Sequence, residues 1–175
     1  MSKESNPDVM TPPAPDTAMP KLALIVSNSP KAQAGVEELR QSYEWVSPAE
    51  AEALVVVGGD GFLLHVLHEM LEWDHILPCY GVNLGTVGFL MNGLSEGGLS
   101  IAERVAEAHP VCVRPLRMHA TNQAGKTFSY YAINEVSLLR ETRQSAKVEV
   151  RINGKVRMEE LAGDGILLAT SAGST

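Results

Sequence analysis

One carboxylate in this sequence, Asp60, stands in a setting suited to chemistry, within the turn 58–61 of sequence Gly-Gly-Asp-Gly. The turn follows Leu54 to Val57, an apolar and valine-rich run typical of a buried strand, and precedes a segment of helical periodicity. Glycines allow the backbone to approach a phosphate, and a helix N-terminus offers free amides. A carboxylate there can act as a general base on a hydroxyl or anchor a metal. An aspartate that only caps the helix is the structural alternative.

Two further polar motifs follow later in the chain. Asn134 and Glu135 interrupt the otherwise apolar segment from Tyr130 to Leu139, where an amide and a carboxylate can hold ribose hydroxyls or a base edge. The alternative is that these two side chains simply face solvent. Asp164 lies between two glycines and precedes the hydroxyl-rich glycine turn 170–175.

A glycine-punctuated loop, Gly81 to Phe89, is the remaining candidate for ligand contact. Its glycines can bring the backbone close to a ligand, and Phe89 is available to stack on a base. Taken alone, such a loop is more often a purely structural turn.

Two resemblances to known motifs do not hold. Ala124 to Thr127 looks like the end of a phosphate-binding P-loop, but the motif requires a glycine where Ala120 stands. His65, His68 and His75 have no cysteine or further histidine at a known metal-binding spacing, so we interpret them as part of a solvated helix face. We therefore assign no metal ligands to the protein itself.

Composition limits the class of protein. The chain has 175 residues, of which 45% are apolar and 20% charged, with a net charge of −7. It has no basic stripe typical of nucleic-acid binders and no apolar run long enough to span a membrane, so we expect neither partner. Residues 1–20 have no apolar signal region and read as a disordered tail. The two cysteines lack a disulfide or metal spacing, as expected for a reduced cytoplasmic protein.

The periodicity changes along the chain. Strands are expected at 22–26, 54–57 and 76–82, and helices at 31–43, after residue 61, and at 99–108. From Val113 onward the pattern predicts strands at 116–121, 127–139, 148–152, 156–158 and 166–170, with a hairpin turn at Asn153-Gly154. This pattern predicts an α/β (Rossmann-like) domain over 21–113 and antiparallel β structure over 114–175.

Taken together, the motifs resemble those of the NAD kinase family. The Gly-Gly-Asp-Gly turn is also found in phosphofructokinases and in diacylglycerol and sphingosine kinases. Three motifs are more specific to NAD kinases: the Asn-Glu pair, the Gly-Asp-Gly at 163–165 and the ending Thr-Ser-Ala-Gly-Ser-Thr. The segment NEVSLLR resembles that of alphaproteobacterial members in particular. Two positions depart from the usual pattern: Phe62 stands where many members have threonine, and Ser171 where proline is usual.

The resemblance implies an enzyme with an active site between an α/β domain and a β-sandwich domain. It implies ATP as phosphoryl donor, Mg²⁺ as cofactor, NAD as acceptor, and a cytoplasmic homo-oligomer when full length. Asp60 would be the general base on the adenosine ribose 2′-hydroxyl. The nucleotide contacts implied by the family motifs are Asp60, Gly61, His65, Asn134, Glu135, Asp164, Ala172 and Thr175.

Two alternatives remain at this point. A lipid or sugar kinase can share the glycine turn alone. Because the family's sequences continue past Thr175 into further sandwich strands, the β-sandwich is expected to be incomplete here, and the chain can also be a non-catalytic fragment.

Overall fold

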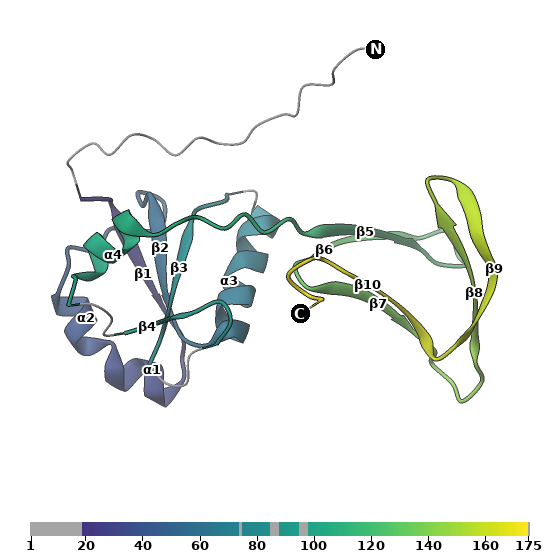
Figure 1. The fold of residues 1–175 in the computed structure, drawn as a ribbon, viewed down its shortest axis with the longest axis horizontal. Coiled ribbons are helices and arrows are strands. Elements are labelled where there is room, and N and C mark those ends of the chain that lie inside the picture. Colours follow the sequence, from purple (N-terminus) through teal and green to yellow (C-terminus); the bar gives the residue numbers. More distant parts are fainter. Residues whose placement is uncertain (1–18, 74, 85–87, 95–97, 175) are drawn as a thin grey trace, which may run out of the picture.

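The computed structural model describes residues 19–73, 75–84, 88–94 and 98–174. The expected tail at 1–20 falls almost entirely outside these ranges. Within them the chain forms a parallel sheet with helices on both faces, followed by a series of antiparallel strand pairs (Figure 1).

The parallel sheet has four strands in the order β1-β2-β3-β4. They are β1 (Leu22–Val26), β2 (Ala53–Val57), β3 (Cys79–Asn83) and the two-residue β4 (Asn92–Gly93). All five residues of β2 are buried, because β1 and β3 flank it and helices cover both of its faces. The uniformly apolar sequence of β2 is therefore explained by its central place.

The helices divide between the two faces of this sheet. One face is covered by α1 (Pro30–Gly35), α2 (Glu37–Gln41) and α4 (Ile101–Glu107), and the other by α3 (Asp60–Trp73), which buries Leu63, Val66 and Met70. The single helix expected over 31–43 is wrong: the structure has two short helices. The break follows Gly35, a residue that weakens helices, and the fully buried Val36 lies between them.

The antiparallel part consists of three two-stranded ladders. Their strands are β5 (Leu116–Thr121), β6 (Thr127–Ala132), β7 (Glu135–Leu139), β8 (Ala146–Ile152), β9 (Lys155–Gly163) and β10 (Gly165–Ala169), paired as β5–β6, β7–β10 and β8–β9. Asn153 and Gly154 both have positive φ, 52° and 74°, as the tight turn of the β8–β9 hairpin requires.

The long strand expected over 127–139 is instead two strands. The chain leaves β6 after Ala132 and begins β7 at Glu135, so Ile133 and Asn134 form a bend between two ladders. Asn134 therefore stands at a change of direction, and Glu135 is the first residue of the strand that follows. Other segments of the chain can pack against this bend.

Burial differs between the two parts. Leu138, Leu167 and Leu168 in the β7–β10 ladder are 57%, 58% and 63% exposed, whereas the valines of β2 are fully buried.

The α/β fold with additional antiparallel strands agrees with the fold class expected from the sequence. Among the described helices, none has the length and apolar character needed to cross a membrane.

Candidate functional site

Asp60 is the first residue of α3, and its side chain is bound to a loop that follows β3. The backbone N–H of Phe89 donates to Oδ2 at 3.0 Å, and that of Leu90 donates to Oδ1 at 3.3 Å. The backbone of Gly88 lies directly against the carboxylate, because a methyl group built there would fall 2.3 Å from both oxygens. Two segments that the sequence places 29 residues apart thus meet at one carboxylate.

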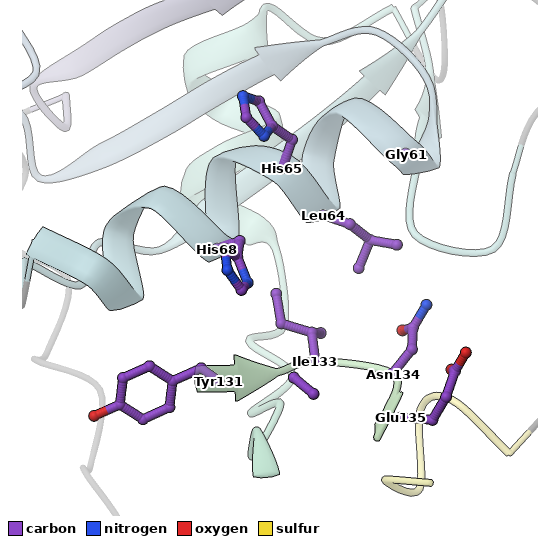
Figure 2. A pocket seen from close by; sticks show the side chains of 9 residues that line it. Gly61, Leu64, His65, His68, Tyr131, Ile133, Asn134 and Glu135 are labelled. Atoms are coloured by element: carbon purple, nitrogen blue, oxygen red, sulfur yellow. The ribbon is translucent and has the colours of Figure 1, made fainter. Parts of the chain in front are cut away.

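A pocket of about 410 Å³ opens beside the first turns of α3. Its walls come from α3 on one side and from the bend between β6 and β7 on the other (Figure 2); the lining residues are Gly61, Leu64, His65, His68 and Tyr131 to Glu135. Figure 2 shows Asn134 and Glu135 towards the Gly61 end of the helix, and Tyr131 towards the other end. The volume is within the range of small-molecule sites.

The pocket brings together four of the residues singled out from the sequence: Gly61, His65, Asn134 and Glu135. Among the described residues, the side chains of Asn134 and Glu135 have no hydrogen-bond partner, so their polar atoms remain available to a ligand. Polar groups that converge on a partly apolar pocket are typical of ligand sites.

The two histidines on α3 each pair with a glutamate one helical turn further on. His65 lies 3.6 Å from Glu69, and His68 lies 3.3 Å from Glu72. The side chain of His65 is 64% exposed and that of His68 38%. Within the described residues no group of three or more histidine, cysteine or acidic side chains is placed to hold a metal ion. Both histidines line the pocket, a position that their interpretation as part of a solvated helix face did not include.

The turn after β10 is fastened to the bend that carries Asn134. The hydroxyl of Thr170 donates to the carbonyl of Ile133 at 2.7 Å and accepts from the backbone N–H of Gly173 at 3.0 Å. The backbone N–H of Thr170 donates to the carbonyl of Asn134 at 2.8 Å. Gly173 packs so tightly that an added methyl would lie 2.1 Å from that same carbonyl oxygen. Ala172 is therefore held next to the Asn-Glu pair, whereas Thr175 lies outside the described residues.

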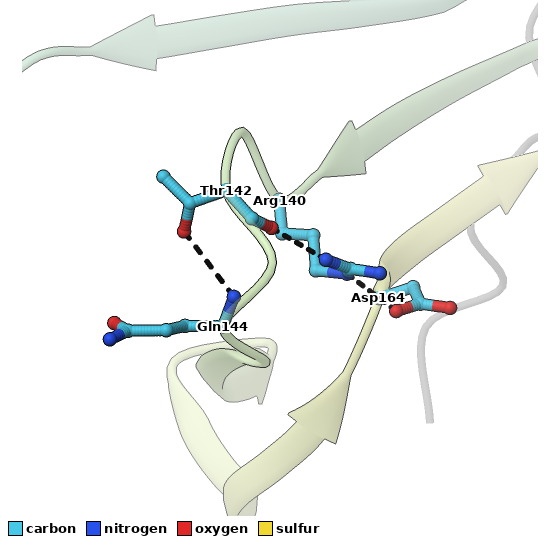
Figure 3. A network of polar contacts seen from close by, with 4 residues as sticks. All are labelled: Arg140, Thr142, Gln144 and Asp164. Carbon is cyan, nitrogen blue, oxygen red and sulfur yellow. Dashed lines mark hydrogen bonds and ion pairs between the residues drawn. The ribbon is translucent and has the colours of Figure 1, made fainter.

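Asp164 lies elsewhere. It occupies the far end of the β7–β10 ladder, where Arg140 donates to its Oδ1 at 2.6 Å and to the carbonyl of Thr142 (Figure 3). The ladder is five residue pairs long, so its two ends are on the order of 14 Å apart. Asp164 and Arg140 line a different hollow of about 470 Å³. Within this chain, Asp164 does not lie near the other candidate residues.

Two structural relationships at the candidate site were not found from the sequence. The first is the docking of Asp60 on Phe89 and Leu90, for which the only signal was the density of glycines in the loop. The second is the role of Thr170, a hydroxyl residue at the end of an apolar strand. Both depend on contacts between segments far apart in sequence, which local periodicity does not report.

Several proteins with similar sequences are named NAD kinases. The NAD kinase of Zymomonas mobilis is 46% identical over 155 residues, which are 89% of this chain and 59% of that protein. The NAD kinase of Cereibacter sphaeroides is 48% identical over the same length, with the same coverage. The NAD kinase of Caulobacter vibrioides is 48% identical over 161 residues, 92% of this chain and 60% of that protein. No family model matches the chain.

Over nearly its whole length the chain is similar to NAD kinases. It spans about 60% of the length of the curated relatives it matches. The similarity covers 155 residues or more, far beyond the four residues of the glycine turn.

A solved structure shares the fold of this chain. The crystal structure of yeast NADH kinase complexed with NADH superposes with a TM-score of 0.54 at 20% sequence identity, covering 88% of this chain and 49% of the yeast chain. The common fold confirms the arrangement of an α/β part followed by antiparallel strands.

Proposed function

We propose that the protein transfers a phosphoryl group from ATP to the 2′-hydroxyl of the adenosine ribose of NAD, which gives NADP. The observation that carries this proposal is the pocket between the start of α3 and the bend at Asn134 and Glu135, with the Asp60 carboxylate fixed next to its Gly61 edge. The names of the relatives supply the substrate, and the polar groups of the pocket are of the kind that binds a nucleoside.

Asp60 is the general base in this proposal. A carboxylate has about four lone-pair positions, and the amides of Phe89 and Leu90 use one on each oxygen. Each oxygen therefore keeps an acceptor position for a ribose hydroxyl. A hydroxyl is a weak nucleophile at neutral pH, and a positioned base that takes its proton contributes a factor of ~10²–10⁴ to the rate.

The phosphates of ATP are held without a P-loop lysine. The Gly-Gly-Asp-Gly turn places free amides of the α3 N-terminus where a phosphate can bind. Mg²⁺ typically binds through one or two carboxylates together with substrate phosphates and water. Because Asp60 acts as the base in this proposal, the ion would be held chiefly by the ATP phosphates and water, and it would neutralise charge on the transferred group.

Asn134 and Glu135 bind the ribose and base of NAD in this proposal, and Gly61, Ala172 and Thr175 supply further contacts. His65 is a contact at the exposed side of the pocket. The α/β domain (21–113) and the start of the β-sandwich (114–175) form the two walls of the site. Asp164 also contacts NAD in this proposal. Because it lies apart from the other candidate residues of its own chain, it would reach NAD bound to a neighbouring copy in the cytoplasmic homo-oligomer that we propose.

The test is the Asp60→Asn variant of the complete protein. NADP formation is measured with ATP and Mg²⁺, and NAD binding is measured by calorimetry. We expect turnover to fall by at least ~10²-fold while NAD still binds, because asparagine keeps the shape of the side chain but cannot take the proton. Turnover near that of the unmodified protein would contradict the assignment of the base.

A further inference from the structure

Gly88 occupies the space directly beneath the Asp60 carboxylate. A Cβ atom at this position would lie 2.3 Å from Oδ1 and Oδ2 and 2.4 Å from the carboxyl carbon. These distances are far shorter than any contact between non-bonded atoms. The carboxylate and a side chain at position 88 therefore cannot occupy their places at the same time.

The requirement for glycine at this position is one of space. The φ angle of Gly88 is not in the left-handed region, in contrast to Gly98 and Gly125, whose φ values are +71° and +79°. An alanine could adopt the backbone conformation of Gly88. What it could not do is leave room for the carboxylate of Asp60.

The neighbouring glycines show that this constraint is local. An added Cβ at Gly59 or Gly61, on either side of Asp60, would meet no atom within 4 Å. At Gly88 the obstacle is the end of a flexible side chain, so a methyl group there would displace the Asp60 carboxylate rather than disrupt the backbone. The displaced carboxylate would lose its two bonds from the amides of Phe89 and Leu90.

We propose that Gly88 is a positioning residue for Asp60: its missing side chain lets the carboxylate dock on two consecutive amides, which fixes both the direction and the plane of the carboxylate. Two donors to two different oxygens define that plane, whereas a single bond would leave it free to rotate. The docked carboxylate presents its remaining acceptor positions in one orientation. The expected effect of Gly88 on catalysis rests on the proposed function. The steric conflict between a side chain at position 88 and the Asp60 carboxylate does not depend on that function.

The geometric content is tested by a melting-temperature cycle on the complete protein with Gly88→Ala, Asp60→Ala and the double variant. We expect Gly88→Ala to lower the melting temperature when Asp60 is present and to have little effect in the Asp60→Ala background, since the clash is then absent. Gly59→Ala is the matched control, and its effect should be the same in both backgrounds. If Gly88→Ala has the same effect with and without Asp60, the two residues do not share this space and the proposal is wrong. This readout does not depend on kinase activity, so it stands even if the proposed function fails.

The catalytic consequence is tested by a kinetic cycle with Gly88→Ala, Asp60→Asn and the double variant. We expect Gly88→Ala to lower kcat by on the order of 10²-fold while KM for NAD changes by less than about threefold, since it acts on the base and not on the binding residues. The double variant should be no slower than Asp60→Asn alone, within about twofold, because the displaced group no longer acts as a base. Losses that multiply in the double variant, or a normal kcat for Gly88→Ala, would show that Gly88 does not act through Asp60.

Discussion

The hydroxyl of Thr170 donates a hydrogen bond to the carbonyl oxygen of Ile133 across 37 residues of sequence, at 2.7 Å, and both residues are buried. The same hydroxyl accepts from the backbone N–H of Gly173. One oxygen atom thus joins the bend that carries Asn134 to the turn that carries Ala172. The relative positions of two groups of proposed NAD contacts depend on it.

Replacing Thr170 with valine should therefore loosen this junction. The substitution keeps the shape of the side chain but leaves the Ile133 carbonyl and the Gly173 N–H without their partner, at a cost of about 1–3 kcal/mol in the free energy of unfolding. We expect weaker NAD binding as well, because the turn is no longer held against Asn134. Denaturant unfolding and calorimetric titration of the complete protein measure the two effects. Thr170→Ser is the control, since it retains the hydroxyl, and equal effects of serine and valine would refute the role of the hydrogen bonds.

Asn134 and Glu135 are predicted to act on ligand binding rather than on stability. Their side chains line the pocket and have no hydrogen-bond partner among the described residues. Replacing either with alanine should weaken NAD binding by tenfold or more, about 1.4 kcal/mol, with little change in the melting temperature. Ser137, an exposed polar residue in the same strand, provides the control as Ser137→Ala. A lowered melting temperature together with unchanged NAD affinity would mean that the pair is structural.

The sequence predicted the local elements well and the long-range contacts poorly. Strand β1 and strand β5 were predicted with the bounds that the structure has, because alternating or continuous apolar residues report burial directly. The bend at Ile133 and Asn134 was missed, because a two-residue change of direction leaves no periodic signal.

The residues of the candidate site were likewise only partly predictable from the sequence. Gly61, Asn134 and Glu135 could be chosen from residue type and motif, and they line one pocket. The place of Asp164 at the opposite end of its ladder could not be predicted, since it follows from the pairing of β10 with β7 and not from spacing along the chain. For the same reason the dependence of Asp60 on Gly88 became visible only in three dimensions.

The two cysteines should differ in reactivity. Burial raises the pKa of the Cys79 thiol to about 11, from an ordinary value of 9.0, whereas Cys112 is exposed. Since the thiolate is the reactive form, raising the pKa lowers its fraction at pH 8. We expect iodoacetamide at pH 8 to modify Cys112 well before Cys79, as followed by peptide mass spectrometry. In denaturant the two rates should become similar, and similar rates in the native protein would contradict the burial of Cys79.

The antiparallel ladders predict how the 175-residue chain behaves when it is expressed alone. Leu167 and Leu168 are adjacent in β10 and so point to opposite faces of the ladder, yet both are more than half exposed, as is Leu138 on the paired strand. The β7–β10 ladder is therefore uncovered on both faces, and each ~100 Å² of apolar surface left bare forgoes about 2.5 kcal/mol of hydrophobic stabilisation. Strands with exposed apolar faces and free edges tend to pair with other chains.

We therefore expect this chain alone to self-associate and to form no measurable NADP with ATP and Mg²⁺. Size-exclusion chromatography with light scattering measures the first property, and an NADP assay the second. Leu138→Lys together with Leu168→Lys should reduce the association, because charged side chains on the exposed ladder oppose pairing. Gln123→Lys together with Ser145→Lys, at exposed positions outside the strands, is the control for the same change of charge and should leave the association in place. A monodisperse monomer that forms NADP at an ordinary kinase rate would contradict both expectations.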